Sequence, residues 1–237
     1  MGSMLTALRW VYRTIVPRFI RRSKLAGSIK RRVLWHDAIY DKKYYARNVE
    51  SSASRSASTI ADSIMADLAP QRVIDVGCGT GALLSVLRDR GCEVEGIENS
   101  SAALEYCRDR HLDVTRLDLE SDVLDHPGTF DVVISMEVAE HLPEKVASRY
   151  VGLLASLGSA IVFTAATPGQ GGTDHVNKQT PLYWIRKFQS CGFTHDELLS
   201  TRWRETWRAS SLVERFYWKN IMVFRHTDKL TPAAIDS

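Results

Sequence analysis

Several features are scarce or missing in this sequence of 237 residues. No segment approaches the roughly 18 to 20 consecutive apolar residues that a membrane-spanning helix needs, and the beginning lacks the apolar core and cleavage site of a signal peptide. The four cysteines show no CxxC spacing, which argues against a zinc knuckle or a disulfide framework. We therefore expect a cytoplasmic protein with reduced thiols.

Acidic residues are absent from the first 32 positions, which hold nine Lys or Arg. The rest of the chain has 22 basic and 28 acidic residues, a net charge of −6. Such a body is a poor platform for a long polyanion, because nucleic-acid binding depends on neutralising many phosphates. The charge pattern therefore argues against DNA as a partner and leaves RNA as a minority alternative.

The basic segment also has the apolar spacing of an amphipathic helix, which Pro17 interrupts. Its apolar positions are Leu5, Leu8, Val11, Tyr12, Ile15 and Val16. We interpret it as a helical extension or lid that covers the protein's own apolar surface. Docking on an anionic substrate or peripheral contact with an anionic membrane is the alternative, and the sequence leaves a homodimer open.

From residue 72 onward, short apolar runs alternate with amphipathic segments, which is typical of an α/β fold with a parallel sheet. The expected strands span 72–76, 93–97, 113–117, 131–135 and 160–165, and the expected helices span 82–90, 101–110, 144–157 and 181–190. The segments 193–200 and 216–225 predict two further strands with a short helix between them, and such a pair should be antiparallel.

We expect three parts in the chain: a basic extension over 1–50, a catalytic domain over 51–226 and a mobile tail over 227–237.

A glycine-rich turn follows the first predicted strand in "VIDVGCGTGALL", with Gly77, Gly79 and Gly81. Glycines at such a turn let the backbone approach a ligand closely, and the following helix offers free N–H groups. The spacing also fits G-x-G-x-x-[GA], so a dinucleotide-binding dehydrogenase has to be considered.

Two acids follow the next two strands. Glu98 ends the second strand, where a carboxylate can accept both hydroxyls of a ribose, and Asp118 follows the third, where it can receive the exocyclic amine of an adenine. Because the loops after parallel strands meet at one edge of the sheet, these groups should line one crevice.

These motifs resemble those of class I S-adenosylmethionine (SAM)-dependent methyltransferases, from "VIDVGCGTG" through Glu98 and "LDLE" to "FDVVISMEVAEHLP". The resemblance implies a Rossmann-like, seven-stranded, mostly parallel sheet with one antiparallel strand and helices on both faces. It also implies a set of cofactor-binding residues: Asp75, which orients the glycine loop, Gly77, Gly79, Gly81, Glu98, Asp118 and Met136.

Charged side chains follow the buried fourth strand in "SMEVAEH". If the chain turns helical there, Glu137, Glu140 and His141 share one helix face at the ligand edge. Two carboxylates and an imidazole suit Mg²⁺ or Mn²⁺ better than a thiolate-seeking metal. The flexible loop "TPGQGGTDHVNKQ" begins at the same edge and brings His175.

The pattern E-x-x-E-H with a distant His resembles the metal-binding set of small-RNA 2′-O-methyltransferases, and E-x-x-E-H alone also resembles ubiquinone-pathway O-methyltransferases. These resemblances imply Glu137, Glu140, His141 and His175 as metal ligands. We expect His141 or His175 to be the catalytic base, with a divalent ion held by Glu137 and Glu140. In the alternative without metal, the acids cap the helix and brace the pocket, and His141 serves directly as the base.

The segment 137–225 resembles bacterial methyltransferases associated with glycan and glycoside assembly, through "EVAEHLP", "PGQGGTDHVN" and "YWIRKF". We therefore predict an O-methyltransferase that acts on a hydroxyl of a saccharide or glycoside. RNA 2′-O-methylation, a small natural product or quinone as acceptor, and a membrane-docked scaffold are the alternatives. Aromatic residues suited to stacking on a sugar, or to core packing, are Tyr44, Tyr45, Trp184 and Trp203.

Overall fold

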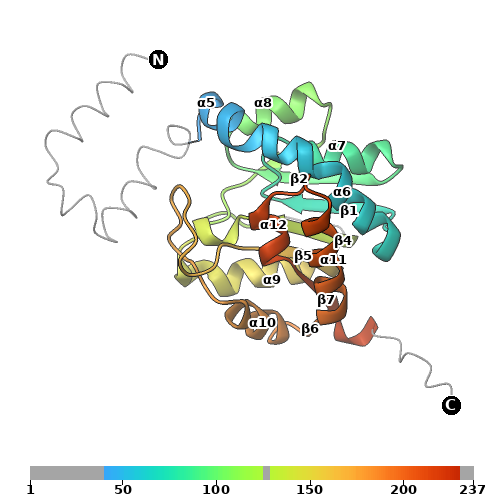
Figure 1. Cartoon of the computed structure of the whole chain (residues 1–237). Helices are drawn as coiled ribbons and strands as arrows, with labels where there is room; N and C mark the ends of the chain where they lie inside the picture. Colours follow the sequence, from blue (N-terminus) through green and yellow to red (C-terminus); the bar gives the residue numbers. More distant parts are fainter. Residues whose placement is uncertain (1–39, 125–128, 230–237) are drawn as a thin grey trace, which may run out of the picture.

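The computed structural model describes residues 40–124 and 129–229. They form a seven-stranded sheet in the order β3-β2-β1-β4-β5-β7-β6, with helices on both sides (Figure 1). The strands are β1 Arg72–Val76, β2 Glu93–Glu98, β3 Val114–Arg116, β4 Phe130–Met136, β5 Gly158–Thr164, β6 Phe193–His195 and β7 Met222–His226. The five strands expected between residues 72 and 165 are all present, with ends shifted by two residues at most.

Strand β7 is the one antiparallel member of the sheet. It pairs antiparallel with β5 through Val162 and Val223, and antiparallel with β6 through Thr194 and Arg225. All other neighbouring strands are parallel. The sequence prediction of a Rossmann-like, mostly parallel sheet with one antiparallel strand is therefore confirmed.

Helices cover the sheet on both faces because successive strand residues point to opposite sides. In β4, Val133 packs in a layer with α9 and α10, while Val132 and Ile134 pack in a layer with α6 and α11. The helices are α5 Lys42–Tyr44, α6 Glu50–Leu68, α7 Ala82–Asp89, α8 Ser101–Asp109, α9 Ala147–Leu157, α10 Pro181–Gln189, α11 Glu197–Ala209 and α12 Arg215–Asn220. Shorter helical turns are the π-helical η2 Tyr45–Val49 and the 3-10 turns η3 Ala139–His141, η4 Glu144–Val146 and η5 Thr227–Lys229.

The prediction for the last two strands was wrong in extent. Strand β6 ends at His195, because Asp196 caps α11 by accepting a hydrogen bond from Leu199 N at 3.0 Å. The first five residues of "FYWKNIMVFR" lie in α12, and β7 begins only at Met222. Two helices, rather than one short helix, thus connect the antiparallel pair.

The expected N-terminal helix lies outside the described residues. Within them, α5, η2 and α6 continue without a break across residue 50, where the sequence predicts a boundary between extension and domain. Among the described residues, no helix is both long and apolar enough to cross a membrane. All four cysteines are free thiols.

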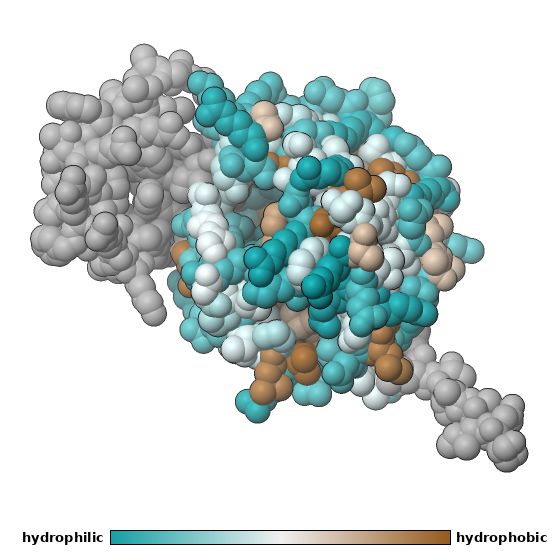
Figure 2. All heavy atoms as spheres, in the orientation of Figure 1, coloured by the Kyte–Doolittle hydropathy of each residue, from teal (hydrophilic) through white to brown (hydrophobic). Residues whose placement is uncertain are grey.

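Apolar side chains are concentrated in the two core layers. The face shown in Figure 2 is mostly hydrophilic, with hydrophobic residues in separate small groups. The most exposed large apolar side chains come from different segments: Val123, Val176, Leu182, Leu198 and Leu212. Burial of the sheet between its helices therefore supplies most of the driving force for folding.

We expect Gly158→Ala to destabilise the protein, because an added Cβ would lie 2.6 Å from the carbonyl oxygen of Phe130 on the neighbouring strand. Overpacking of this kind costs about 1–3 kcal/mol. Gly152→Ala, inside α9 with nothing within 4 Å of the new Cβ, is the matched control and should stabilise by roughly 0.5–1 kcal/mol. Urea unfolding measures both, and equal effects of the two substitutions would contradict the packing argument.

Candidate functional site

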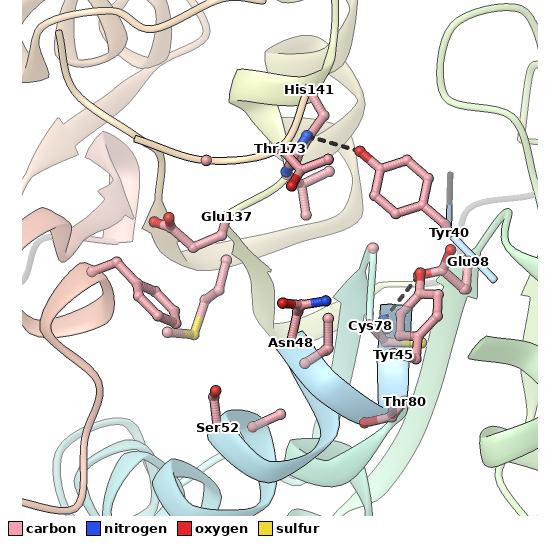
Figure 3. A pocket seen from close by; sticks show the side chains of 18 of the residues that line it. Tyr40, Tyr45, Asn48, Ser52, Cys78, Thr80, Glu98, Glu137, His141 and Thr173 are labelled. Carbon is pink, nitrogen blue, oxygen red and sulfur yellow. Dashed lines mark hydrogen bonds between the residues drawn. The ribbon is translucent and has the colours of Figure 1, made fainter. Parts of the chain in front are cut away.

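A cavity of about 460 Å³ lies at the carboxyl ends of β1, β2 and β4 (Figure 3). It is large enough for a small-molecule ligand. One end is lined by the glycine loop, Glu98 and Asp118, and the other by Glu137, His141 and the loop that carries His175. The residues that the sequence assigned to two separate tasks therefore share one continuous space.

The glycine loop follows β1 with three left-handed residues. The φ angles of Gly77, Gly79 and Gly81 are 83°, 56° and 73°. A Cβ at Gly77 would also lie 2.5 Å from Cγ2 of Val138, so both conformation and space require glycine there. Main-chain contacts fix the loop, since Gly77 N and Cys78 N both donate to Ile97 O.

Glu98 is the carboxylate that holds this loop. Its Oε2 accepts a hydrogen bond from Gly79 N at 2.9 Å, and its Oε1 accepts from Asn99 N and Ser100 N, each at 2.8 Å. The side chain is only 8% exposed, and these three main-chain donors compensate its burial. Asp118 lines the same cavity, with its carboxylate in a local turn that accepts from Glu120 N and the Ser121 hydroxyl.

Asp75 lies beneath the loop at the end of β1 and is 7% exposed. Burial, with the nearby Glu98 charge as the second cause, raises the pKa of Asp75 to about 8. Among the described residues no hydrogen bond joins this carboxylate to the glycine loop, which Glu98 contacts instead. Met136 also lines the cavity, at the end of β4.

The segment after β4 is not a regular helix, so the expected single helix face for Glu137, Glu140 and His141 was wrong. Glu137 has φ 56°, and only Ala139–His141 form a 3-10 turn. This kink turns Glu140 into the core, while Glu137 and His141 face the cavity (Figure 3).

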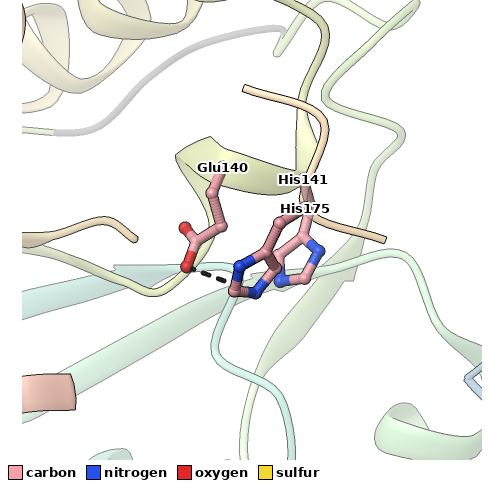
Figure 4. A group of neighbouring side chains, drawn as sticks. All are labelled: Glu140, His141 and His175. Atoms are coloured by element: carbon pink, nitrogen blue, oxygen red, sulfur yellow. Dashed lines mark ion pairs between the residues drawn. The ribbon is translucent and has the colours of Figure 1, made fainter. Parts of the chain in front are cut away.

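Three of the four predicted metal ligands come together. One ligand atom each from Glu140, His141 and His175 lie within 4.8 Å of one another, and the Glu140 carboxylate points at the His175 ring (Figure 4). The distance from His175 Nε2 to Glu140 Oε1 is 3.9 Å. The imidazole rings of His141 and His175 pack edge to face, with their centroids 5.0 Å apart.

Glu140 is fully buried, and among residues 40–124 and 129–229 no hydrogen-bond donor reaches either of its carboxylate oxygens. Burial raises the pKa of Glu140 well above its usual range, and the Glu137 charge raises it further. His175 also has an unpartnered buried nitrogen, Nδ1, and burial lowers the pKa of its ring. A divalent cation beside His175 Nε2 would satisfy the orphaned oxygens of Glu140, so the donor set fits a metal ion.

Gly172 makes room for His175. A Cβ on Gly172 would overlap the His175 ring, so this glycine is required for the ring to lie where it does. The base of the loop is fixed too, because Val176 N and Asn177 N both donate to the carbonyl of Glu140, at 2.9 and 3.0 Å. The loop thus brings His175 to Glu140 through backbone contacts.

Glu137 lies outside the group of three and faces two amide side chains. Gln170 Nε2 donates to its Oε2 at 3.2 Å, and Asn220 Nδ2 donates to its Oε1 at 3.3 Å. Burial raises the pKa of Glu137, while contact with the Glu140 carboxyl and, more weakly, with Thr164, Asn220 and Gln170 acts in the opposite direction.

A family model described as "Methyltransferase domain" matches residues 45–212, which is more than half of the chain. The chain belongs to this family. The prediction of a methyltransferase of class I is confirmed as far as the family. The matched residues include lining residues at both ends of the cavity, His175 among them.

Curated relatives of this methyltransferase domain match only part of its length. The ubiquinone biosynthesis O-methyltransferase of Azoarcus sp. (strain BH72) is 37% identical over 105 residues, which cover 41% of this chain and 45% of that protein. The enzyme of the same name from Thiobacillus denitrificans is 39% identical over 85 residues, covering 33% and 37%. The matched region therefore spans less than half of these relatives.

Solved structures share the fold at low identity. A SAM-bound amino pentose methyltransferase from Micromonospora echinaspora aligns with a TM-score of 0.57 and 19% identity, covering 80% of this chain and 97% of that one. Magnesium protoporphyrin IX methyltransferase from Synechocystis PCC 6803 aligns with a TM-score of 0.55 and 17% identity, covering 90% and 97%. These likenesses support the fold.

The structure also adds site residues to this methyltransferase domain that the sequence did not indicate. Tyr40 reaches His141 through a hydrogen bond of 3.1 Å between its hydroxyl and Nδ1 (Figure 3). Gln170 and Asn220 surround Glu137. These contacts join segments far apart in the sequence, so sequence patterns do not reveal them. The one signal in the sequence is the pair of glycines on either side of Gln170.

Two of the aromatic candidates for sugar stacking are in the core instead. Trp184 and Trp203 are each 1% exposed, packed in the layers of α10 and α11. Tyr44 and Tyr45 do line the cavity. The alternative of core packing therefore holds for both tryptophans.

We expect the free energy of unfolding to fall as pH rises from about 5.5 to 8.5 in the presence of EDTA. Folded Asp75, with its pKa raised to about 8, keeps a proton that the unfolded chain has already lost above about pH 4, so ionisation favours unfolding across this window. One such group contributes at most about 1.4 kcal/mol per pH unit.

Asp75→Asn should make this fall smaller, whereas Asp113→Asn, at an exposed position, should leave it unchanged. Urea unfolding at several pH values measures the slope. Equal slopes in the wild type and Asp75→Asn would show that Asp75 is not protonated in the fold.

Proposed function

We propose that this protein is a SAM-dependent O-methyltransferase whose acceptor is a small molecule with a hydroxyl group. The observation that carries the proposal is the continuous cavity that joins the glycine loop and Glu98 to His141 and His175, which lie beside the buried Glu140. The relatives named as ubiquinone biosynthesis O-methyltransferases favour a phenolic acceptor over the saccharide that the sequence predicted. A sugar acceptor is the second candidate, supported by the amino pentose methyltransferase among the structural neighbours.

In this proposal the cofactor occupies the end of the cavity at the glycine loop. Glu98 accepts the ribose hydroxyls with the part of its carboxylate that faces the cavity, Asp118 lies at the adenine, and Gly77 and Gly79 line the cavity beside the methionine moiety. Met136 then lies between the cofactor and acceptor ends. Alignment of an acceptor oxygen behind the methyl group is the main catalytic contribution of such a cavity.

At the acceptor end, Glu140, His141 and His175 would hold a divalent ion such as Mg²⁺ or Mn²⁺. When bound, the ion stabilises the negative charge that develops on the acceptor oxygen. The two orphaned oxygens of Glu140 support this assignment. Without the ion, His141 and His175 are the candidate bases, and the lowered pKa of His175 favours its neutral, proton-accepting form near pH 7.

The acceptor is tested by a methyl-transfer screen with radiolabelled SAM against catechol-type phenols, monosaccharides, glycosides and a short RNA. We expect transfer to phenols at least about tenfold faster than to sugars or RNA, because the sequence relatives act in quinone biosynthesis by name. Glu98→Gln is the control, because its amide would face main-chain N–H donors and weaken cofactor binding. Faster transfer to sugars than to phenols would show that the acceptor is a saccharide. Failure to bind S-adenosylhomocysteine would refute the methyltransferase activity.

The metal is tested by titrating Mn²⁺ into the protein in a calorimeter. We expect Glu140→Gln to weaken Mn²⁺ binding at least about tenfold, since it removes the one carboxylate of the group. Gly172→Ala should also weaken it by displacing His175, whereas Gly171→Ala, with nothing within 4 Å of the new Cβ, should not. Full activity in excess EDTA, with equal Mn²⁺ affinity in all variants, would refute the metal site. The mechanism would then rely on a histidine base without a metal ion.

A further inference from the structure

The carboxylate of Glu137 is held by a closed set of hydrogen bonds with two amides. Besides the bonds from Gln170 and Asn220 to Glu137, Asn220 Nδ2 donates to Gln170 Oε1 at 2.9 Å. The three residues come from the end of β4, the loop after β5 and the end of α12. This cluster therefore joins three segments that are distant in the sequence.

Gln170 is the inward-facing residue at the tip of its loop. Within the range 168–173, all residues except Gln170 are exposed. A Cβ added at Gly169 or Gly171 would meet nothing within 4 Å. The base of the loop has its own anchor, the two hydrogen bonds from Val176 N and Asn177 N to Glu140 O. Lys178 Nζ, just beyond the base, also donates to the Gln170 carbonyl at 3.2 Å, but the hydrogen bonds from the tip to the ends of β4 and α12 run through the Gln170 side chain.

The main chain at Glu137 is strained and fixed in place. A non-glycine residue in the left-handed region at φ 56° costs free energy, and it persists where the surroundings determine the conformation. Here the Glu137 N–H lies within hydrogen-bonding distance of both the carbonyl and the hydroxyl oxygen of Thr164 on β5, at 3.1 and 3.0 Å. The strained backbone aims the carboxylate at Gln170 and Asn220.

We propose that Glu137 is a positioning residue that latches the tip of the loop 167–177 over the acceptor end of the cavity, through Gln170 and Asn220. Glu137 and Glu140 then have separate tasks. Both Glu137 oxygens already accept amide hydrogen bonds, which a metal would have to displace, whereas both Glu140 oxygens lack donors. Glu140 faces the histidines and Glu137 controls the loop.

The latch determines when the cavity is covered. Gln170, Gly171, Gly172, Thr173, Asp174 and His175 all line it. Release of Gln170 frees the exposed tip, while the backbone anchor at Val176 and Asn177 keeps His175 near Glu140. We expect acceptor entry and product release to require this opening of the tip, a consequence that rests on the proposed methyl transfer.

The test exchanges the amide and the carboxylate. Gln170→Glu places two carboxylates against each other, and hydrogen exchange of the amides of 169–173, measured by mass spectrometry, should become at least about tenfold faster. Glu137→Gln should also speed exchange. The double substitution E137Q/Q170E restores one amide and one carboxylate, with Asn220 still able to donate to both, and should return exchange to within about threefold of wild type.

Mn²⁺ titration separates the latch from the metal group. Glu137→Gln and the double variant should keep Mn²⁺ affinity within about threefold, whereas Glu140→Gln should lose at least about tenfold with unchanged exchange at 169–173. With an acceptor from the screen, Gln170→Glu should raise KM more than it lowers kcat. If methyl transfer or Mn²⁺ binding is absent altogether, the exchange rescue still decides the proposal.

Two results would overturn the latch. The first is wild-type exchange in Gln170→Glu, and the second is a double variant that exchanges as fast as the faster single variant. A loss of Mn²⁺ affinity in Glu137→Gln as large as that in Glu140→Gln would instead make Glu137 a ligand. Should Gln170→Glu fail to fold, Glu137→Gln and the double variant give the same comparison.

Discussion

The pairing of β4 with β1 on one side and β5 on the other is the constraint on which both ends of the cavity depend. Asp75 of β1 lies opposite Ile134, and Met136 at the end of β4 lies opposite Thr164 of β5. This register brings the ends of three parallel strands to one edge, so the glycine loop and the segment after β4 face each other. A cofactor site and an acceptor site can then share a wall, and Val138 fills the space above Gly77.

Three glutamate carboxylates at this edge differ in the hydrogen-bond donors that reach them. Glu98 accepts three main-chain hydrogen bonds, Glu137 accepts two from amide side chains, and Glu140 accepts none. A buried anion without donors is costly unless it takes up a proton or a cation. The first two acids are thus suited to fixing loops through these hydrogen bonds, and the third is the one whose charge state responds to a ligand.

The sequence predicts the fold well because its signals are local. Apolar runs bounded by glycine or charge defined β1, β2, β4 and β5, and the glycine spacing located the cofactor loop. The helix face for Glu137, Glu140 and His141 could not be predicted correctly, because the left-handed Glu137 is imposed by hydrogen bonds to Thr164 on another strand. Gln170 and Asn220 were missed for the same reason, since their partner lies 33 and 83 residues away.

The loop that carries His175 shows how one short segment can serve two purposes without conflict. Its base is attached through main-chain donors to the carbonyl of Glu140, so His175 is located by contacts that no side-chain rearrangement at the tip disturbs. Its tip is attached through one side chain, Gln170, between exposed glycines. Opening the tip therefore breaks the two hydrogen bonds of the Gln170 side chain and leaves both backbone bonds at the base intact. Such a division lets a methyltransferase domain exchange its acceptor while the group of Glu140, His141 and His175 stays assembled.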